Sequence, residues 1–410
     1  MSFAIAIRIF FFVLLVLSAV VGRRVVHWVQ AFGKDDVSRR RLKWISIGTW
    51  VFLNLATLYF IVMGLRTRGS IQQTWHMIFL YPWFAWLVTT MALAAILAAK
   101  GIISLPYRIA QWWKRKQTGE QKADGDRREF LARAATALPA ALLLTSGYGI
   151  VRAQSDFDWF EPELKLKDWP KELEGLRIMQ ISDPHVGNFM PGEKFAGLIE
   201  QINQRPCDML MLSGDIINNN MAWMPECMEA MHKLKLPKYG AYVCIGNHDY
   251  FAGGPEEILQ GMRDLGMTVV RDDHVVVPIG NSKINVAGID YPMWSGGHGL
   301  RGTRLEPRVD TALAGRDPEA PTIMLTHHPH AFDRAAEHGV QLTLAGHTHG
   351  GQFAFSYPGG KTVSLGDLMF KYVAGEYQKN GSYLYVNRGI GNWFPMRLGA
   401  PPEVTLITVG

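Results

Sequence analysis

Five short apolar runs in the second half of the 410-residue chain each end in residues that can bind metals. The runs cover residues 176–182, 208–213, 241–245, 322–326 and 342–345. The polar residues that follow them are Asp183 and His185, Asp215, Asn247 with His248 and Asp249, His327, and His347 with His349. Short apolar runs separated by turns or helical stretches predict the strands of an α/β domain. Ligands bind at the carboxyl ends of strands in such sheets, so these side chains are expected to meet.

The chemistry of this set suits divalent ions. Carboxylate, imidazole and amide groups are ligands for ions such as Mn, Fe or Zn. They are too many for one tetrahedral site, whereas two ions sharing a carboxylate, roughly 3.5–4 Å apart, would use them well. Of the 13 histidines, only His27 and His76 precede residue 151, so histidine is concentrated where chemistry is expected. Each motif alone is weak, but their joint occurrence by chance is improbable.

These motifs resemble the calcineurin-like metallophosphoesterase superfamily, whose pattern is D-x-H, G-D, G-N-H-D, a strand-end H, and G-H-x-H. The chain shows all five blocks in that order, beginning near residue 176. It is especially similar to an exported, membrane-associated bacterial branch, in which the last block continues as it does in residues 346–352. The resemblance implies an α/β fold, a two-sheet metallophosphoesterase sandwich flanked by helices, over residues 158–410.

The resemblance also implies roles for single residues. Seven metal ligands form two groups with a bridging carboxylate: Asp183, His185 and His349 for one metal, Asn247, His327 and His347 for the other, and Asp215 between them. His248 would contact the phosphate or protonate the leaving oxygen, and Asp249 would support His248 from behind. The family block S/T-H-x-P selects His327 over His328 as the ligand.

The remaining histidines and two arginines are expected outside the set of metal ligands. His328 and His330 are expected behind the ligands or at the surface, and His298, in a glycine-rich stretch, either contacts substrate or lies on a surface loop. Arg388 and Arg397 either contact phosphate or are structural. Three further histidines are expected on solvated helices or loops: His232, His274 and His338.

A phosphoesterase mechanism follows from these roles. Two divalent ions would clamp phosphoryl oxygens and provide a hydroxide that attacks phosphorus, with His248 as general acid. The substrate would be a phosphate ester, with lipid-linked phosphates and cell-envelope phosphodiesters as candidates. Two alternatives remain open: a nucleotide-sugar-lipid pyrophosphohydrolase, and a membrane scaffold or sensor without catalysis. A vestigial fold is expected to lose some of the ligands, and none is missing here.

The first part of the chain, residues 1–151, is predicted to be an all-α membrane region. Three stretches approach the ~20 apolar residues needed to cross a bilayer, and a fourth is weaker. They cover residues 3–21, 45–63, 78–99 and 130–151. The formal charge of +6 comes largely from basic clusters beside these runs, a pattern that orients membrane helices. Membrane lipids are therefore the expected partners, and nucleic acid is not.

Loop charge predicts the orientation. The loops after the first and third runs are strongly basic, whereas the loop after the second holds only Arg66 and Arg68. Basic loops stay in the cytoplasm, so the catalytic domain is expected on the outer, periplasmic side of a bacterial inner membrane. Arg127 and Arg128 resemble a twin-arginine export signal, and an ordinary basic flank is the alternative.

The cysteines exclude two kinds of site. Cys207, Cys227 and Cys244 are an odd, scattered set with neither disulfide-framework nor CxxC zinc spacing. Buried thiols are expected.

Overall fold

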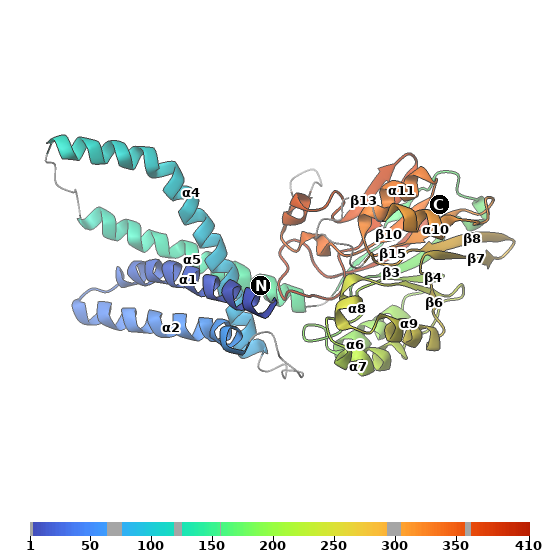
Figure 1. Cartoon of the computed structure of the whole chain (residues 1–410), viewed down its shortest axis with the longest axis horizontal. Helices are drawn as coiled ribbons and strands as arrows, with labels where there is room; N and C mark the ends of the chain where they lie inside the picture. The colour runs from blue at the N-terminus through green and yellow to red at the C-terminus, as the bar shows by residue number, and fades with distance from the viewer. Residues whose placement is uncertain (1–2, 64–75, 119–124, 156, 293–304, 357–361) are drawn as a thin grey trace. The chain divides into compact units, whose positions relative to one another are not determined.

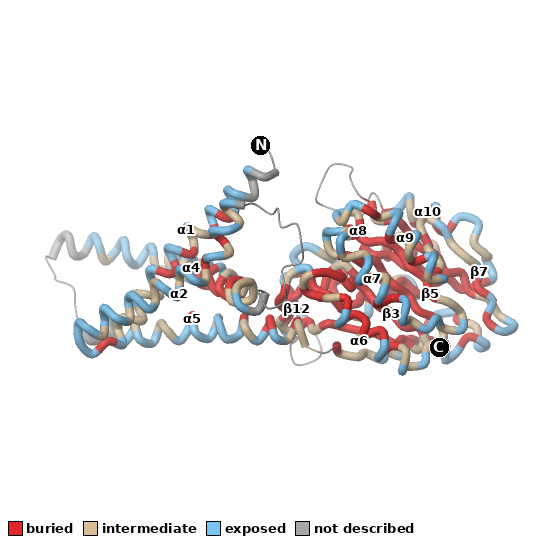
Figure 2. The backbone as a smooth tube through the Cα atoms, turned by 90° about the horizontal axis from the view of Figure 1, so that it is seen from below, coloured by how far each residue is buried: buried red, intermediate tan, exposed pale blue. Residues whose placement is uncertain are grey.

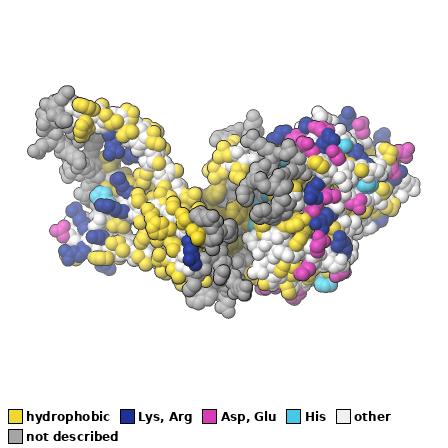
Figure 3. Space-filling model, viewed as in Figure 1, with side chains coloured by type: hydrophobic (Ala, Val, Ile, Leu, Met, Phe, Trp, Pro, Cys, Tyr) yellow, Lys and Arg dark blue, Asp and Glu magenta, His cyan; other side chains and the backbone are white. Residues whose placement is uncertain are grey.

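A computed structural model describes residues 3–63, 76–118, 125–155, 157–292, 305–356 and 362–410 of the chain. These residues divide into two compact units, Met1–Val151 and Arg152–Gly410. The first unit is helical and its surface is dominated by hydrophobic side chains, whereas charged side chains are spread over the second (Figure 3).

The first unit is built from long apolar helices. They are α1 (Phe3–Gln30), α2 (Asp36–Met63), the short π-helix η1 (His76–Leu80), α4 (Tyr81–Thr118) and α5 (Gly125–Gln154). Four segments of these helices are long and apolar enough to cross a membrane: Arg8–Gln30, Asp36–Val62, Ile78–Trp113 and Phe130–Gln154. The four spans expected from the sequence are confirmed as apolar helices, and the helices extend beyond the apolar runs into the basic flanks.

Polar contacts join three of these helices. The hydroxyl Oγ of Ser18 on α1 accepts from Trp50 Nε1 on α2 at 3.0 Å and from Trp86 Nε1 on α4 at 2.8 Å. Trp83 Nε1 on α4 donates to Thr57 Oγ1 on α2 at 2.7 Å. Such bonds satisfy polar groups that lipid could not, so they favour one packing of the helices.

The second unit contains two large sheets and a hairpin. The first sheet has the order β1-β15-β3-β4-β5-β6, with β2 also paired to β15. Its strands are β1 (Asp158–Phe160), β2 (Glu163–Leu164), β3 (Leu176–Ile181), β4 (Met209–Ser213), β5 (Ala241–Cys244), β6 (Thr268–Val269) and β15 (Glu403–Val409). The second sheet has the order β13-β14-β10-β9-β8-β7. Its strands are β7 (Asp273–Ile279), β8 (Ser282–Gly288), β9 (Thr322–Leu325), β10 (Leu342–Ala345), β13 (Gly375–Lys379) and β14 (Ser382–Val386). β11 (Ala354–Ser356) and β12 (Thr362–Ser364) form the hairpin.

The sheets pack face to face and helices cover their outer faces (Figure 1). Side chains of both sheets, such as Met211 and Ile323, share one apolar core, which explains why β4, β5, β9 and β10 are buried throughout (Figure 2). A second core lies between the first sheet and α6 (Gly192–Asn203), α7 (Met224–Met231) and α9 (Pro255–Asp264). A third joins the second sheet to α10 (Glu306–Leu313) and α11 (Phe332–Glu337). The two-sheet sandwich expected from the resemblance is confirmed.

Parallel pairing brings the candidate residues to one edge. β3, β4 and β5 run parallel in the first sheet, and β9 and β10 run parallel in the second. Their carboxyl ends therefore lead into loops on the same side of each sheet. Cys227 and Cys244 are buried free thiols as expected, and Cys207 is half-buried.

Candidate metal centre

The loops that carry the expected ligands have an unusual backbone. Among the described residues, ten that are not glycine have positive φ, and five of these are expected ligands: Asp183, His185, Asp215, His347 and His349. Their φ angles lie between 46° and 72°. The left-handed region costs about 1 kcal/mol or more for such residues, so it persists only where the surroundings enforce it. Its concentration in these loops marks a functional site.

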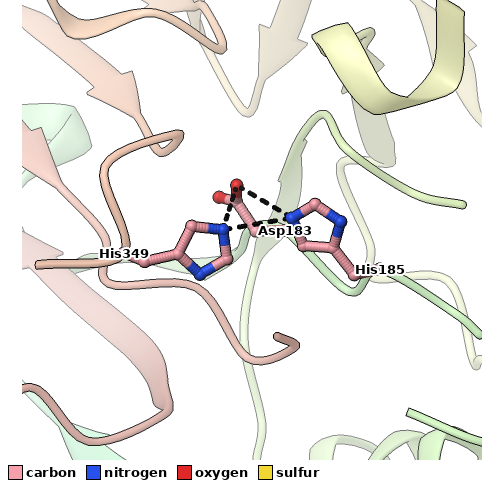
Figure 4. Close-up of side chains that lie close together, drawn as sticks. All are labelled: Asp183, His185 and His349. Carbon is pink, nitrogen blue, oxygen red and sulfur yellow. Dashed lines mark hydrogen bonds and ion pairs between the residues drawn. The ribbon is translucent and has the colours of Figure 1, made fainter. Parts of the chain in front are cut away.

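The first group is Asp183, His185 and His349 (Figure 4). Asp183 and His185 follow β3, and His349 begins the 3₁₀ turn η5 (His349–Gly351) after β10. The Nε2 atoms of the two histidines lie 3.1 Å apart, and Asp183 Oδ1 lies 3.3 Å from His349 Nε2. All three side chains are buried. The three ligand atoms therefore converge on one small volume.

The second group is Asp215, His327 and His347. His347 Nδ1 lies 3.1 Å from His327 Nε2, and Asp215 Oδ2 lies 3.2 Å from His327 Nε2. The other nitrogen of His327, Nδ1, donates to the carbonyl oxygen of Ser213 at 2.8 Å, which leaves Nε2 free to bind a metal. Asp215 Oδ2 also lies 3.4 Å from His185 Nε2, so this carboxylate stands between the two groups.

Two oxygen atoms of the candidate ligands are buried and have no hydrogen-bond partner among the described residues: Asp183 Oδ1 and Asn247 Oδ1. An unpaired buried polar atom costs about 1–3 kcal/mol, so such atoms usually signal an ion or water. Asn247 begins α8 (Asn247–Ala252) and lines the same groove as Asp215 and His347. The donors present therefore fit two divalent cations, with Asn247 as the amide ligand expected for the second.

His248 lies beside both groups. Its ring centroid is 4.4 Å from that of His185, and its backbone N–H donates to Asp215 Oδ1 at 2.7 Å. Its Nδ1 lies 3.2 Å from the side-chain oxygen of Asn218, so Asn218 can orient the ring and leave Nε2 to exchange a proton. Asn218 was not predicted from the sequence, although its position in the loop after Asp215 could have indicated a residue of the centre.

Asp249 is fully buried and faces the backbone. One oxygen accepts from the N–H groups of Ile216 and Ile217 at 2.8 and 3.0 Å, and the other accepts from Gly246 at 2.9 Å. Burial, and next the charge of Asp215, raise the pKa of Asp249 to about 7. Asp249 thus ties the loop after β4 to the loop after β5. Among the described residues no hydrogen bond joins Asp249 to the His248 ring, so Asp249 acts on His248 through the backbone.

Arg397 lies behind the first group and is fully buried. Its Nη2 donates to His349 Nδ1 at 2.8 Å and to the carbonyl of Gly391 at 2.6 Å, and its Nε donates to Asn392 Oδ1 at 2.6 Å. Burial lowers the pKa of this guanidinium to about 9. Of the two roles open to Arg397, the structure supports the structural one: it orients His349 and has no exposed surface for phosphate.

Charge within the centre is tightly coupled. Burial alone would lower the pKa of His327, but the carboxylates of Asp215 and Asp183 outweigh it and raise the pKa to about 9. Burial and the neighbouring His327 lower the pKa of His347 to about 3. Burial alone would raise the pKa of Asp183, but His349 and His327 hold it below its usual range. Both carboxylates therefore offer ionised oxygens at neutral pH.

The other described histidines of the second unit lie outside the candidate metal centre. His328 is buried against His347, with ring centroids 4.8 Å apart, and its Nδ1 accepts from the backbone of His330. His274 and His338 are half-buried and bond to Ala312 and Asp310, and His232 is exposed. His298 and the side chains of Arg127 and Arg128 lie outside the described residues.

A groove of about 390 Å³ opens onto this centre. Its lining includes candidate metal ligands and His248, together with four apolar side chains: Leu365, Met369, Phe370 and Trp393. A phosphate group in this groove would meet the candidate metal ligands and His248 together.

Comparison with known proteins agrees with this geometry. Residues 176–351 match the family described as calcineurin-like phosphoesterase. Residues 1–154 match a second family, the transmembrane domain of a probable calcineurin-like phosphoesterase. The metallophosphoesterase YkuE of Bacillus subtilis is 31% identical over 291 residues, which cover 69% of this chain and 97% of YkuE. The chain belongs to the calcineurin-like metallophosphoesterase family.

Other similar proteins match different shares of the chain. The phosphodiesterase YaeI of Escherichia coli is 26% identical, over 68% of this chain and 98% of YaeI. A metallophosphoesterase of Helicobacter pylori is 32% identical over 59% of this chain, but the match spans only 63% of that relative's length. A dimetal phosphatase from Danio rerio, compared by structure, has a TM-score of 0.32 and 11% identity, covering 53% of this chain and 88% of that one.

Proposed function

We propose that this chain is a metal-dependent phosphoesterase, most suited to phosphodiesters, acting at the outer face of a bacterial cytoplasmic membrane. One observation carries the proposal: Asp215 Oδ2 lies 3.4 Å from His185 Nε2 and 3.2 Å from His327 Nε2, where it can bridge two metals. The similarity to YaeI, a phosphodiesterase, supports the diester preference. The strongly basic loops before the second span and after the third span support the outward orientation.

The residues have distinct tasks in this proposal. Two divalent ions, when bound, supply Lewis-acid polarisation of phosphoryl oxygens and a nucleophile at neutral pH. Asp183, His185 and His349 would hold one ion, Asn247, His327 and His347 the other, and Asp215 would bridge them. His248, which lines the groove, protonates the leaving oxygen through Nε2, and Asn218 holds the opposite ring nitrogen.

Hydrolysis of bis-p-nitrophenyl phosphate by the purified full-length protein tests the proposal. The metal-stripped protein is expected to be inactive and to recover with added Mn²⁺. Asp215→Asn should abolish recovery, and His248→Ala should lower kcat roughly 100- to 10,000-fold. His274→Ala, a half-buried histidine outside the centre, is the matched control and should keep full activity. A folded protein that binds two metals and hydrolyses neither this diester nor p-nitrophenyl phosphate would overturn the proposal and favour a scaffold.

A further inference from the structure

Four large apolar side chains are exposed in the groove or directly beside the residues that line it. Leu365 is 59% exposed, Leu368 85%, Met369 76% and Trp393 51%. We call this set the apolar collar. Leu365, Met369 and Trp393 line the groove together with the candidate ligands. Scattered apolar residues are normal on a protein surface, but a group of them at the entrance of a candidate active site indicates a binding surface.

Hydrogen bonds hold the collar in place. Leu365 and Leu368 delimit the 3₁₀ turn η6 (Leu365–Leu368), which is capped by the backbone N–H of Ser364 donating to Asp367 Oδ2 at 2.6 Å. The N–H groups of Met369 and Phe370 both donate to the Gly366 carbonyl, at 2.9 and 2.8 Å. The turn is therefore closed at both ends, and its apolar side chains are displayed by a defined backbone.

Phe370 extends the apolar surface to the metal ligands. Its half-buried ring meets the ring of His347 edge to face, with centroids 5.4 Å apart. A ligand that fills the groove can thus contact the candidate metal centre at one end and the collar at the other. A water-soluble phosphate ester would use the first contact and leave the second unused.

The loop that carries Trp393 is bonded to the end of a candidate membrane span. The buried side chain of Asn392 donates through Nδ2 to the carbonyl of Ala153 at 2.9 Å. Ala153 lies in the last turn of α5, at the end of the Phe130–Gln154 span, and belongs to the second unit. Trp393, the next residue, is therefore held close to the last turn of this helix. Tryptophan is enriched at membrane interfaces, which suits this place.

We infer that the substrate is a membrane amphiphile, a phosphodiester that carries acyl chains, whose phosphate binds at the metal centre while its chains lie on the apolar collar. This inference rests on the proposed phosphoesterase function and narrows it to one substrate class. The collar's continuity with the groove, and the hydrogen bond from Asn392, next to Trp393, to the end of a candidate membrane span, together favour a lipid over a soluble ester.

Inhibition by two lipids with the same headgroup tests the inference. Dihexanoyl- and dioctanoyl-phosphatidylglycerol are used as competitors of bis-p-nitrophenyl phosphate hydrolysis by the full-length protein in one detergent. Burial of one methylene group is worth roughly fourfold in affinity, and the two lipids differ by four methylenes. The longer lipid is expected to inhibit with a Ki at least about tenfold lower.

Variants separate binding to the collar from partition into micelles. The double variant Leu368→Ser with Met369→Ser should reduce the ratio of the two Ki values at least about threefold. The matched double variant Leu236→Ser with Val276→Ser removes exposed apolar side chains elsewhere in the second unit and should keep the wild-type ratio. Each lipid partitions into the micelles to the same extent whichever protein variant is present. If the collar variant loses its metal or its fold, Leu365→Ser serves in the same comparison.

Different results would refute the phosphoesterase function and the lipid inference. Absence of turnover with both bis-p-nitrophenyl phosphate and p-nitrophenyl phosphate would refute the phosphoesterase function itself. Turnover combined with equal Ki values for both lipids, or with a collar variant that keeps the wild-type ratio, would overturn only the lipid inference. The collar would then be assigned to contact with another protein or with a second copy of the chain.

Discussion

Residues that contact the candidate ligands and His248 fix the orientation of these side chains. His327 shows why: its Nδ1 is committed to the Ser213 carbonyl, and its Nε2 faces two carboxylates. Asn218 and Arg397 hold His248 and His349 in the same manner. Partners of this kind typically affect metal affinity 10- to 100-fold.

Metal affinity should depend on pH through His327. Its pKa in the metal-free protein is raised to about 9, so the imidazole is protonated at neutral pH, whereas a metal requires it neutral. The apparent affinity for Mn²⁺ should therefore rise with pH, by up to about tenfold per unit below pH 9. Calorimetric titration at pH 6.5, 7.5 and 8.5 measures this. An affinity that is constant over the range would contradict the assignment of His327 as a protonated ligand.

Arg397→Gln should weaken one metal site more than the other. Loss of the guanidinium removes the donor to His349 Nδ1, so the ion held by Asp183, His185 and His349 should bind about 10- to 100-fold less tightly. Metal content after equilibrium dialysis, measured by mass spectrometry, reports the loss directly. Arg334→Gln, which removes an arginine on the surface, should leave both ions bound. Retention of both ions by Arg397→Gln would exclude a positioning role.

The elements position the centre through loops at the carboxyl ends of their strands. The loops after β4 and β5 belong to neighbouring parallel strands and are joined by the single carboxylate of Asp249. The loops after β9 and β10 come from the second sheet, so the centre forms only when the sheets are packed together.

Asp249→Ala should destabilise the second unit. Three buried backbone N–H groups would lose their acceptor, which we expect to cost about 2–4 kcal/mol. For a unit of this size, the melting temperature should fall by about 5–15 °C. Maleimide labelling of the buried thiols Cys227 and Cys244 during heating measures it. Asp264→Ala, on the outer helix α9, is the control. A melting temperature within about 2 °C of wild type would show that Asp249 does not join these loops.

At the scale of the whole molecule, a catalytic domain that follows four apolar helices is confined to a membrane surface. The four long apolar helices lie in the first unit, and 11 of the 13 histidines lie in the second. A phosphoesterase attached in this way meets substrates in or near the bilayer at high local concentration.

Orientation can be tested with single cysteines on intact cells. In a Cys207→Ser background, Glu257→Cys in the second unit should react with a membrane-impermeant maleimide. Lys34→Cys, in the basic loop between α1 and α2, should react only after the cells are permeabilised, because basic loops remain in the cytoplasm. The opposite labelling pattern would place the phosphoesterase unit in the cytoplasm and revive the nucleotide-sugar-lipid pyrophosphohydrolase as a candidate.

The sequence by itself determined the ligand types and the strands that deliver them. Asp183, Asp215 and His327 each follow an apolar run whose length and composition are local properties, and such properties can be recognised without a structure. The membrane helices were likewise predictable, because an apolar run long enough to span a bilayer is a property of the sequence alone.

Only the tertiary structure decided which groups support those ligands. Arg397 reaches His349 across 48 residues, and Asn392 reaches Ala153 across 239. Contacts of this kind depend on how loops from separate strands pack, and no local pattern encodes that packing. The apolar collar is similar, since leucines and methionines usually indicate a core, and their exposure beside the groove appears only once the chain is folded.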